Sequence, residues 1–108
     1  MHNFENIQHN FYRMQSVLAE YPILQDRIIE AMLNRLVHDQ VFNLSEIQVL
    51  IREKAIRSQT REGLNNPFIQ EGPAGWENRL SRVRANLIVE QYATQYSFDE
   101  FEETVDII

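Results

Sequence analysis

The chain has no cysteine, and it has only three glycines and three prolines among its 108 residues. Without cysteine it can hold no disulfide framework, no thiolate nucleophile and no cysteine-ligated zinc site. No apolar run approaches the roughly 18 residues that a membrane-spanning helix needs. The N-terminus also lacks the basic region followed by an apolar run that marks a secretory signal. These absences predict a cytoplasmic protein with no membrane segment.

The few helix-breaking residues are concentrated in one segment. Residues 62–77, EGLNNPFIQEGPAGWE, hold all three glycines, two of the three prolines and the only tryptophan. This segment predicts a long loop between two helical regions. Because Phe68, Ile69 and Trp76 are large and apolar, we expect the loop to pack back on the protein, with Trp76 largely buried as its anchor. The alternative is a loop that presents Phe68 to a partner.

Apolar residues recur at helical spacing on both sides of that loop, and no segment shows the alternation of a strand. The pattern predicts an all-α fold, a compact bundle of about five helices in a single domain over residues 1–108. The expected helices are 4–20, 22–39, 43–62, 73–95 and 97–108. The apolar stripe of the last helix runs on to Ile108, which is compatible with an N-terminal module of a longer protein.

Two helix starts carry capping signals. Asn43 is followed three residues later by Glu46, with Phe42 and Ile47 placed for a hydrophobic staple. The last helix repeats the pattern, because Ser97 is followed by Glu100. At the other end of the third helix, Gly63 is expected to be the left-handed residue that terminates it.

The charge is unevenly distributed. The net charge is −6, but residues 52–84 hold seven bases against four acids, and nine of the ten bases in the chain are arginine. If the third and fourth helices pack antiparallel, their arginines could converge on an anion or an RNA phosphate. The arginines of these two helices are Arg52, Arg57, Arg61, Arg79, Arg82 and Arg84, and the candidates for anion binding are Arg57, Arg61, Arg79 and Arg82. Internal pairing with nearby glutamates is the simpler interpretation, and the acidic chain as a whole disfavours nucleic-acid binding.

No arrangement of acidic residues or histidines indicates a metal, a cofactor or catalysis. The three histidines lack metal-ligand spacing, and His38 and Asp39 are expected to point to different sides of their helix. The acidic residues of the last helix have neither the spacing nor the glycine of a calcium loop, so a solvated helix face is expected.

The fourth helix carries two apolar lines. One line is headed by Trp76; the other consists of Ser81, Ala85, Ile88 and Tyr92, at about 130° from the first. A helix with two such lines is either central in a bundle or lies between a core and a partner. We therefore expect an interface formed by Phe68, Trp76, Ser81, Ala85, Ile88 and Tyr92.

These observations predict a non-catalytic helical protein-interaction or regulatory module, which binds a protein partner or forms a homo-oligomer such as a dimer. The alternative is an anion- or RNA-binding accessory domain that uses the arginine set. The sequence indicates neither the partner nor the pathway.

Overall fold

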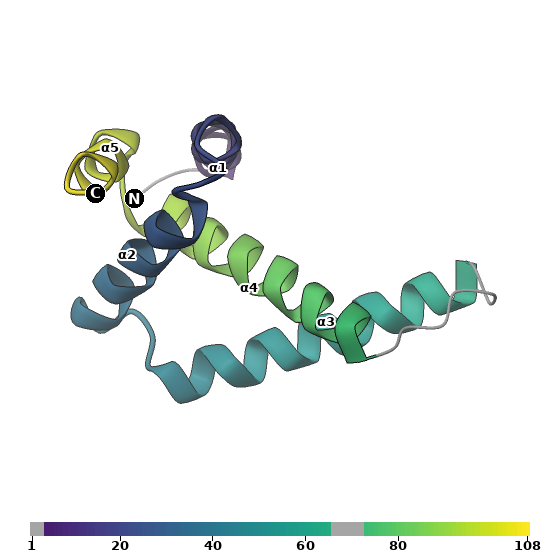
Figure 1. Cartoon of the computed structure of the whole chain (residues 1–108). Coiled ribbons are helices and arrows are strands. Elements are labelled where there is room, and N and C mark those ends of the chain that lie inside the picture. Colours follow the sequence, from purple (N-terminus) through teal and green to yellow (C-terminus); the bar gives the residue numbers. More distant parts are fainter. Residues whose placement is uncertain (1–3, 66–72) are drawn as a thin grey trace. The chain divides into compact units, whose positions relative to one another are not determined.

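In the part of the chain that the computed structural model describes there are five α-helices, which confirms the predicted all-α fold (Figure 1). It describes the backbone of residues 4–65 and 73–108 and the side chains of residues 5–59 and 75–108. Over these ranges there is no strand. The helices are α1 (Phe4–Glu20), α2 (Gln25–His38), α3 (Leu44–Asn65), α4 (Pro73–Gln95) and α5 (Phe98–Asp106). The predicted Phe68 and most of the predicted loop lie outside the described residues.

The chain divides into two compact units. Unit 1 consists of residues 1–41 and 87–108, and unit 2 consists of residues 42–86. Helix α4 therefore contributes its first part to unit 2 and its last part to unit 1. The prediction of a single domain stays a prediction.

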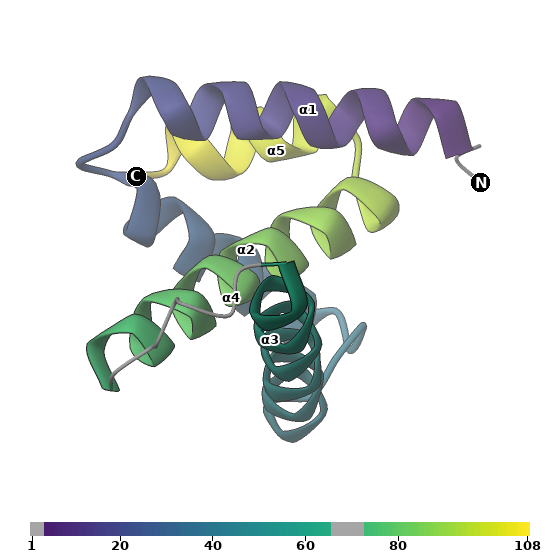
Figure 2. The ribbon, with the colours of Figure 1, turned by 90° about the vertical axis from the view of Figure 1, so that its right-hand side faces the viewer.

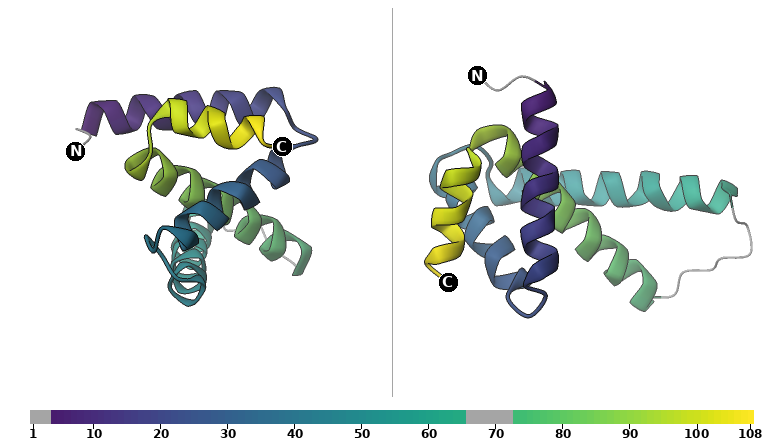
Figure 3. Two further views of the ribbon diagram at one scale, coloured as in Figure 1. Left: turned by 90° about the vertical axis from the view of Figure 1, so that its left-hand side faces the viewer. Right: turned by 90° about the horizontal axis from the view of Figure 1, so that it is seen from above.

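Unit 1 contains α1, α2, the last turns of α4, and α5. Helices α1 and α5 lie side by side and run in the same direction, and α2 contacts both of them (Figures 2 and 3). Helix α2 buries a wide apolar stripe, which consists of Ile28, Ile29, Met32, Leu33 and Leu36. The other buried side chains of this unit include Met14, Leu18, Leu87, Ile88, Val89, Tyr92 and Phe101.

Unit 2 contains α3 and the first part of α4. Its buried apolar residues on α3 are Ile47, Ile51 and Ala55, which recur at 4-4 spacing along one face. Two other aliphatic residues of the helix, Val49 and Ile56, are exposed. Helix α3 therefore buries one stripe and leaves a second apolar line in contact with solvent.

Both predicted N-terminal caps are confirmed. The Asn43 side-chain oxygen accepts a hydrogen bond of 2.8 Å from the Glu46 amide at the start of α3. The Ser97 hydroxyl accepts one of 3.2 Å from the Glu100 amide at the start of α5. Each side chain satisfies one of the amides that has no acceptor inside its own helix.

Helix α2 ends in a tight C-terminal turn. The sequence did not predict this turn, because the residues that form it include no glycine. The Gln40 amide donates to the Val37 carbonyl at 3.1 Å, and the Val41 amide donates to the Leu36 carbonyl at 2.9 Å. This pair of hydrogen bonds is the Schellman motif. It requires a left-handed backbone conformation at the residue that follows the C-cap. Gln40 fills that position with a φ of 60°, although glycine or asparagine would adopt it at lower cost.

Two helix boundaries differ from the prediction by three residues, and the others differ by two residues or fewer. Helix α3 continues through Gly63 to Asn65, so the prediction that Gly63 ends it was wrong. A glycine inside a helix costs only about 1 kcal/mol relative to alanine, and the sequence pattern overestimated that penalty. Helix α2 begins at Gln25 rather than Pro22, because residues 22–24 first form a turn in which the Leu24 amide donates to the Tyr21 carbonyl at 3.0 Å.

Candidate functional site

Unit 1 contains a polar cluster that joins α2, α4 and α5. Arg35 on α2 donates to the hydroxyl of Tyr92 on α4 at 3.1 Å. The Tyr92 hydroxyl lies 2.6 Å from that of Thr104 on α5, and Thr104 donates to the Glu100 carbonyl at 3.2 Å. Because the Thr104 proton is engaged with that carbonyl, Tyr92 is the donor to Thr104. The three hydrogen bonds therefore point in one direction. Arg35 donates to Tyr92, Tyr92 donates to Thr104, and Thr104 donates to the backbone carbonyl of Glu100 on α5.

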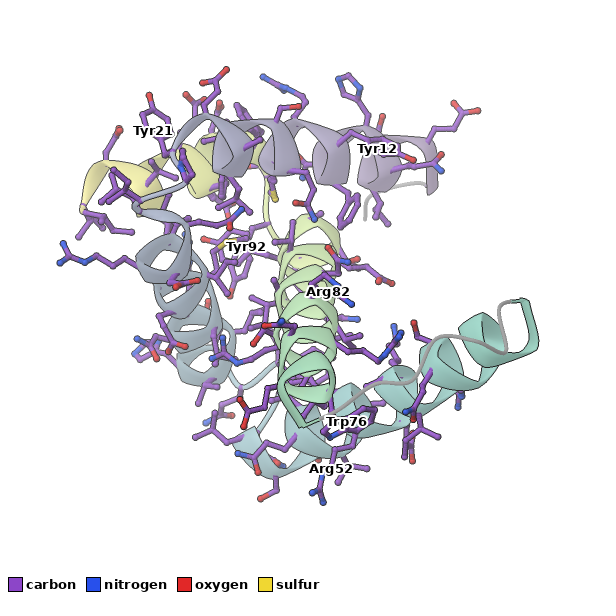
Figure 4. The ribbon with its side chains drawn as sticks, turned by 45° about the vertical axis from the view of Figure 1, so that its right-hand side comes forward. Tyr12, Tyr21, Arg52, Trp76, Arg82 and Tyr92 are labelled. Atoms are coloured by element: carbon purple, nitrogen blue, oxygen red, sulfur yellow. The ribbon has the colours of Figure 1, made fainter. Side chains whose placement is uncertain are left out.

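The same arginine organises a second set of contacts at the end of α2. Its guanidinium lies 4.4 Å from the centre of the Tyr96 ring, 3.8 Å from the carboxylate of Asp39 and 3.6 Å from that of Glu100. The Tyr96 hydroxyl donates to Asp39. Figure 4 shows Tyr92 in the space between α2 and the last turns of α4. Arg35 thus combines cation–π, ion-pair and hydrogen-bond contacts at one junction.

The contacts of the cluster shift three pKa values. The hydrogen bond from Tyr96, helped by His38, lowers the pKa of Asp39 because it stabilises the carboxylate. Partial burial and the Asp39 carboxylate raise the pKa of the Tyr96 phenol. Burial opposes the charge of Arg35, but the hydrogen bond from its guanidinium to Tyr92 and the nearby carboxylate of Glu100 leave its pKa raised. All three shifts favour the charged Arg35 and Asp39 beside a neutral Tyr96.

Helix α1 is attached to this junction through two further side chains. The Asn10 amide donates to the carbonyls of Ala93 and Tyr96, at 3.3 and 2.9 Å, which are acceptors left over at the end of α4. The guanidinium of Arg13 lies 3.8 Å from the centre of the Phe98 ring at the start of α5. The polar cluster and these contacts hold the four helical segments of unit 1 together.

The contacts of the cluster are internal to unit 1. Its hydroxyls and charges are directed at one another, and its residues do not line the hollows on the surfaces of α3, of α1 or between α3 and α4. His38 does contact Asp39, at 3.1 Å, contrary to the expectation that the two would point apart, because Asp39 lies just beyond the last helical residue. The His38 side chain is 87% exposed, however, and projects from the surface. Among the described residues no group of acidic residues and histidines could hold a metal ion.

Unit 2 carries a surface groove between its two helices. The groove has a volume of about 500 Å³, and its walls are mostly apolar. Helix α3 lines it with Ser45, Gln48, Val49, Ile51 and Arg52, and α4 lines it with Leu80, Ser81 and Arg84. We call this site the α3–α4 groove. Two aliphatic residues from α3 and one from α4 meet in it between two arginines.

A second hollow adjoins the groove on the same helix. It is lined by Phe42, Ser45, Glu46, Val49, Leu50 and Glu53, so Ser45 and Val49 belong to both. Val49 is 56% exposed and Ile56 is 53% exposed. Ser45, Val49, Arg52 and Ile56 step along α3 at 4-3-4 spacing and therefore share one face. Of the two exposed apolar residues on this face, Val49 lines both hollows.

The members of the predicted arginine set differ in their surroundings. Arg79 is only 2% exposed and donates to the Ser58 hydroxyl at 2.6 Å, so it is a buried link between α4 and α3. Arg57 and Arg82 are exposed, and the Arg61 side chain lies outside the described residues. The arginines that the structure does bring to a common groove are Arg52 and Arg84. Figure 4 labels Arg52 on α3 and Arg82 on α4.

The predicted interface on α4 needs correction in its second half. Ile88 and Tyr92 are both 0% exposed, and the contacts of Tyr92 come from α2 and α5. They are core residues of unit 1 and cannot receive a partner, because the second apolar line of α4 is covered within the chain from Ile88 onward. The first half of the line differs, because Ser81 is exposed in the α3–α4 groove and Ala85 is half-buried. Trp76, which heads the other apolar line of α4, is of intermediate exposure. Whether Trp76 anchors the loop stays a prediction.

A smaller hollow lies on the surface of unit 1. Its volume is about 240 Å³, and it is lined by Ile7, Gln8, Phe11 and Tyr12 of α1 and by Glu90 of α4. The Tyr12 side chain is 62% exposed and meets the Phe11 ring edge-on, at 5.8 Å between centroids. We call this surface the α1 outer face. Ile7 and Phe11 are both of intermediate exposure, so this face of α1 is only partly covered.

No helix within the described ranges combines the length and the hydrophobicity that crossing a membrane requires. Comparison with protein-family models finds no matching family, and comparisons with curated proteins and with solved structures find no significant match.

Proposed function

We propose that this chain is a non-catalytic helical protein-interaction module, and that its α3–α4 groove docks an amphipathic helix of a partner protein. The observation that carries this proposal is the exposure of Val49 in a groove whose floor and opposite wall are also aliphatic. Large side chains such as valine and leucine gain about 1.5–3 kcal/mol each when they are fully buried. A third helix laid between α3 and α4 would bury Val49 and Leu80 together.

The shape of the groove favours a helix as the ligand. Two neighbouring helices form its walls, and the apolar residues along α3 repeat at the spacing with which helices pack together. Amphipathic helices bind such grooves through anchors at positions i, i+3 or i+4, and i+7. A groove of about 500 Å³ has room for two or three aliphatic anchors of this kind.

The charge around the groove selects the partner. Arg52 and Arg84 line the groove, and residues 42–86 carry seven bases against five acids, a net charge of +2. A docked helix with aspartate or glutamate on either side of its apolar stripe would pair with these arginines. We therefore propose an acidic amphipathic helix as the ligand, with the cytoplasm as the setting that the cysteine-free sequence suggests.

The test uses a synthetic, fluorescently labelled helical peptide with leucines at 3-4 spacing and glutamates on the flanks. Fluorescence anisotropy measures its binding to the full chain. We expect binding that weakens about tenfold or more in Val49→Asp and in Arg52→Glu, because one places a charge in the apolar contact and the other reverses an ion pair. Arg57→Glu is the matched control: Arg57 is exposed on the same helix, about 140° away from Arg52.

Two results would contradict the proposal. One is an affinity for the peptide that is the same in the wild type and in Val49→Asp. The other is equal loss of binding in Arg52→Glu and Arg57→Glu, which would indicate only general attraction between a basic surface and an acidic peptide. If a short RNA instead bound more tightly than the peptide, and binding depended on Arg57 and Arg82, the anion-binding alternative would replace the proposal.

A further inference from the structure

The α1 outer face has the chemistry that the α3–α4 groove requires of its ligand. It presents Ile7, Phe11 and Tyr12 from one helix, with the carboxylate of Glu90 at its edge. Glu5 is exposed and stands seven residues before Tyr12, so it lies on the same line of α1. The only base of α1, Arg13, lies over the Phe98 ring instead. The exposed apolar residues of this face are therefore accompanied by acids.

We infer that the α3–α4 groove of one molecule receives the α1 outer face of a second copy of this chain. This inference rests on the proposed function, since it names a second copy as the bearer of the acidic amphipathic helix. Tyr12, exposed on α1, would enter beside Val49 and Leu80, and Arg52 and Arg84 would face Glu5 and Glu90. Both surfaces lie within described parts of the chain, and each would cover the exposed apolar residues of the other.

The charges of the two units support this pairing. Residues 1–41 and 87–108 hold eleven acids and three bases, a net charge of −8, whereas residues 42–86 have a net charge of +2. Two copies that meet through unlike units attract each other, while two that meet through their acidic units repel. The favoured contact is consequently between unit 2 of one copy and unit 1 of the next.

The tyrosine is a suitable partner for the arginines of the groove. Within unit 1 the chain already places Arg13 over Phe98, at 3.8 Å from the ring centre, and Arg35 over Tyr96, at 4.4 Å. The guanidinium of Arg52 could lie over the exposed Tyr12 ring of a second copy in the same way. In such a contact the guanidinium is stabilised both by the face of the tyrosine ring and by a nearby carboxylate.

This contact joins two different surfaces, so it differs from a twofold dimer. Each molecule keeps one unused groove and one unused α1 outer face, and association continues until a ring closes or a filament forms. Because the contact relies on pairs of opposite charge near the surface, added salt weakens it.

The experiment is sedimentation velocity on the full chain over a range of concentrations, at low and at high salt. We expect concentration-dependent association that high salt suppresses. Val49→Asp disables the groove and Tyr12→Asp disables the α1 outer face, so each variant alone should sediment as a monomer. An equimolar mixture of the two should form a 1:1 complex that does not grow further, because each variant retains the surface that the other has lost. Ile23→Asp is the control, since Ile23 is 93% exposed and lines neither surface.

Circular dichroism confirms that each variant is folded, and Arg52→Glu replaces Val49→Asp if that variant loses its helicity. A wild type that remains monomeric at the highest concentration overturns the inference, as does self-association that persists in Tyr12→Asp. A mixture that stays monomeric overturns it as well. The proposed function is judged separately, because the acidic peptide can bind the groove of a protein that does not self-associate.

Discussion

Replacing Tyr92 by phenylalanine removes a single buried oxygen and keeps the ring. The lost hydroxyl accepts a hydrogen bond from Arg35 at 3.1 Å and donates one to Thr104 at 2.6 Å. A neutral hydrogen bond contributes about 0.5–1.5 kcal/mol to stability, and one to a charged group contributes about 1.5–3 kcal/mol. The two together set an upper range of about 2–4.5 kcal/mol.

The structure reduces that estimate, because both partners keep other contacts. Arg35 retains the Glu100 carbonyl and the carboxylates of Asp39 and Glu100, and Thr104 still donates to Glu100. We therefore expect Tyr92→Phe to lower the free energy of unfolding by about 1–3 kcal/mol. Urea denaturation followed by circular dichroism measures this loss through the transition midpoint.

A double-mutant cycle with Thr104→Val tests the hydrogen bond between the two hydroxyls. If Tyr92 and Thr104 are bonded to each other, the losses from the two single variants overlap, and the double variant loses less than their sum by about 0.5 kcal/mol or more. An unchanged or raised urea midpoint for Tyr92→Phe would refute the reasoning. It would mean that the free-energy cost of burying the hydroxyl is at least as large as the stabilisation from its two hydrogen bonds.

Three further predictions concern stability. Asn43→Ala should cost about 0.5–2 kcal/mol through the lost cap of α3, and an unchanged urea midpoint would contradict the capping role. Ile88→Glu should unfold the protein rather than give a folded monomer, because this side chain is 0% exposed, and retained helicity in circular dichroism would count against its place in the core. For Asp39 the pKa is lowered by folding, so its stabilising contacts are present above the unfolded pKa of about 3.9 and are lost as the pH falls through the folded pKa. The stability difference between the wild type and Asp39→Asn should accordingly shrink in acid, and a difference that stays constant from neutral pH to strong acid would exclude the carboxylate as its source.

Local sequence signals predicted most of the helices. The caps at Asn43 and Ser97 depend on a side chain and an amide only three residues apart, so the sequence contains the whole interaction. The helical ranges were predicted for the same reason, because 3.6-residue periodicity is a local property. Gln40 was missed since a non-glycine residue adopts a left-handed conformation only where the surrounding fold compensates its cost.

The candidate site could be predicted only in part. Val49 and Ile56 are apolar residues beside the buried stripe of α3, but the place of Val49 opposite Leu80 in one groove depends on how two helices pack. For α4, periodicity revealed two apolar lines but not which of them is covered. Tyr92 proved to be covered because Arg35 and Thr104, 57 and 12 residues away in the sequence, reach its hydroxyl. Arg79 was placed in the anion-binding set for a similar reason. Its hydrogen bond to Ser58 joins residues 21 positions apart, and helical periodicity does not reveal such a contact.

The most direct test of the proposed function is a nuclear magnetic resonance titration of the isotope-labelled chain with the unlabelled acidic helical peptide. The amide resonances are followed as the peptide is added. Docking in the α3–α4 groove predicts shifts concentrated at Ser45, Val49 and Arg52 of α3 and at Leu80, Ser81 and Arg84 of α4. Resonances that do not move with excess peptide, or shifts confined to unit 1, would contradict the claim that this groove is the binding site.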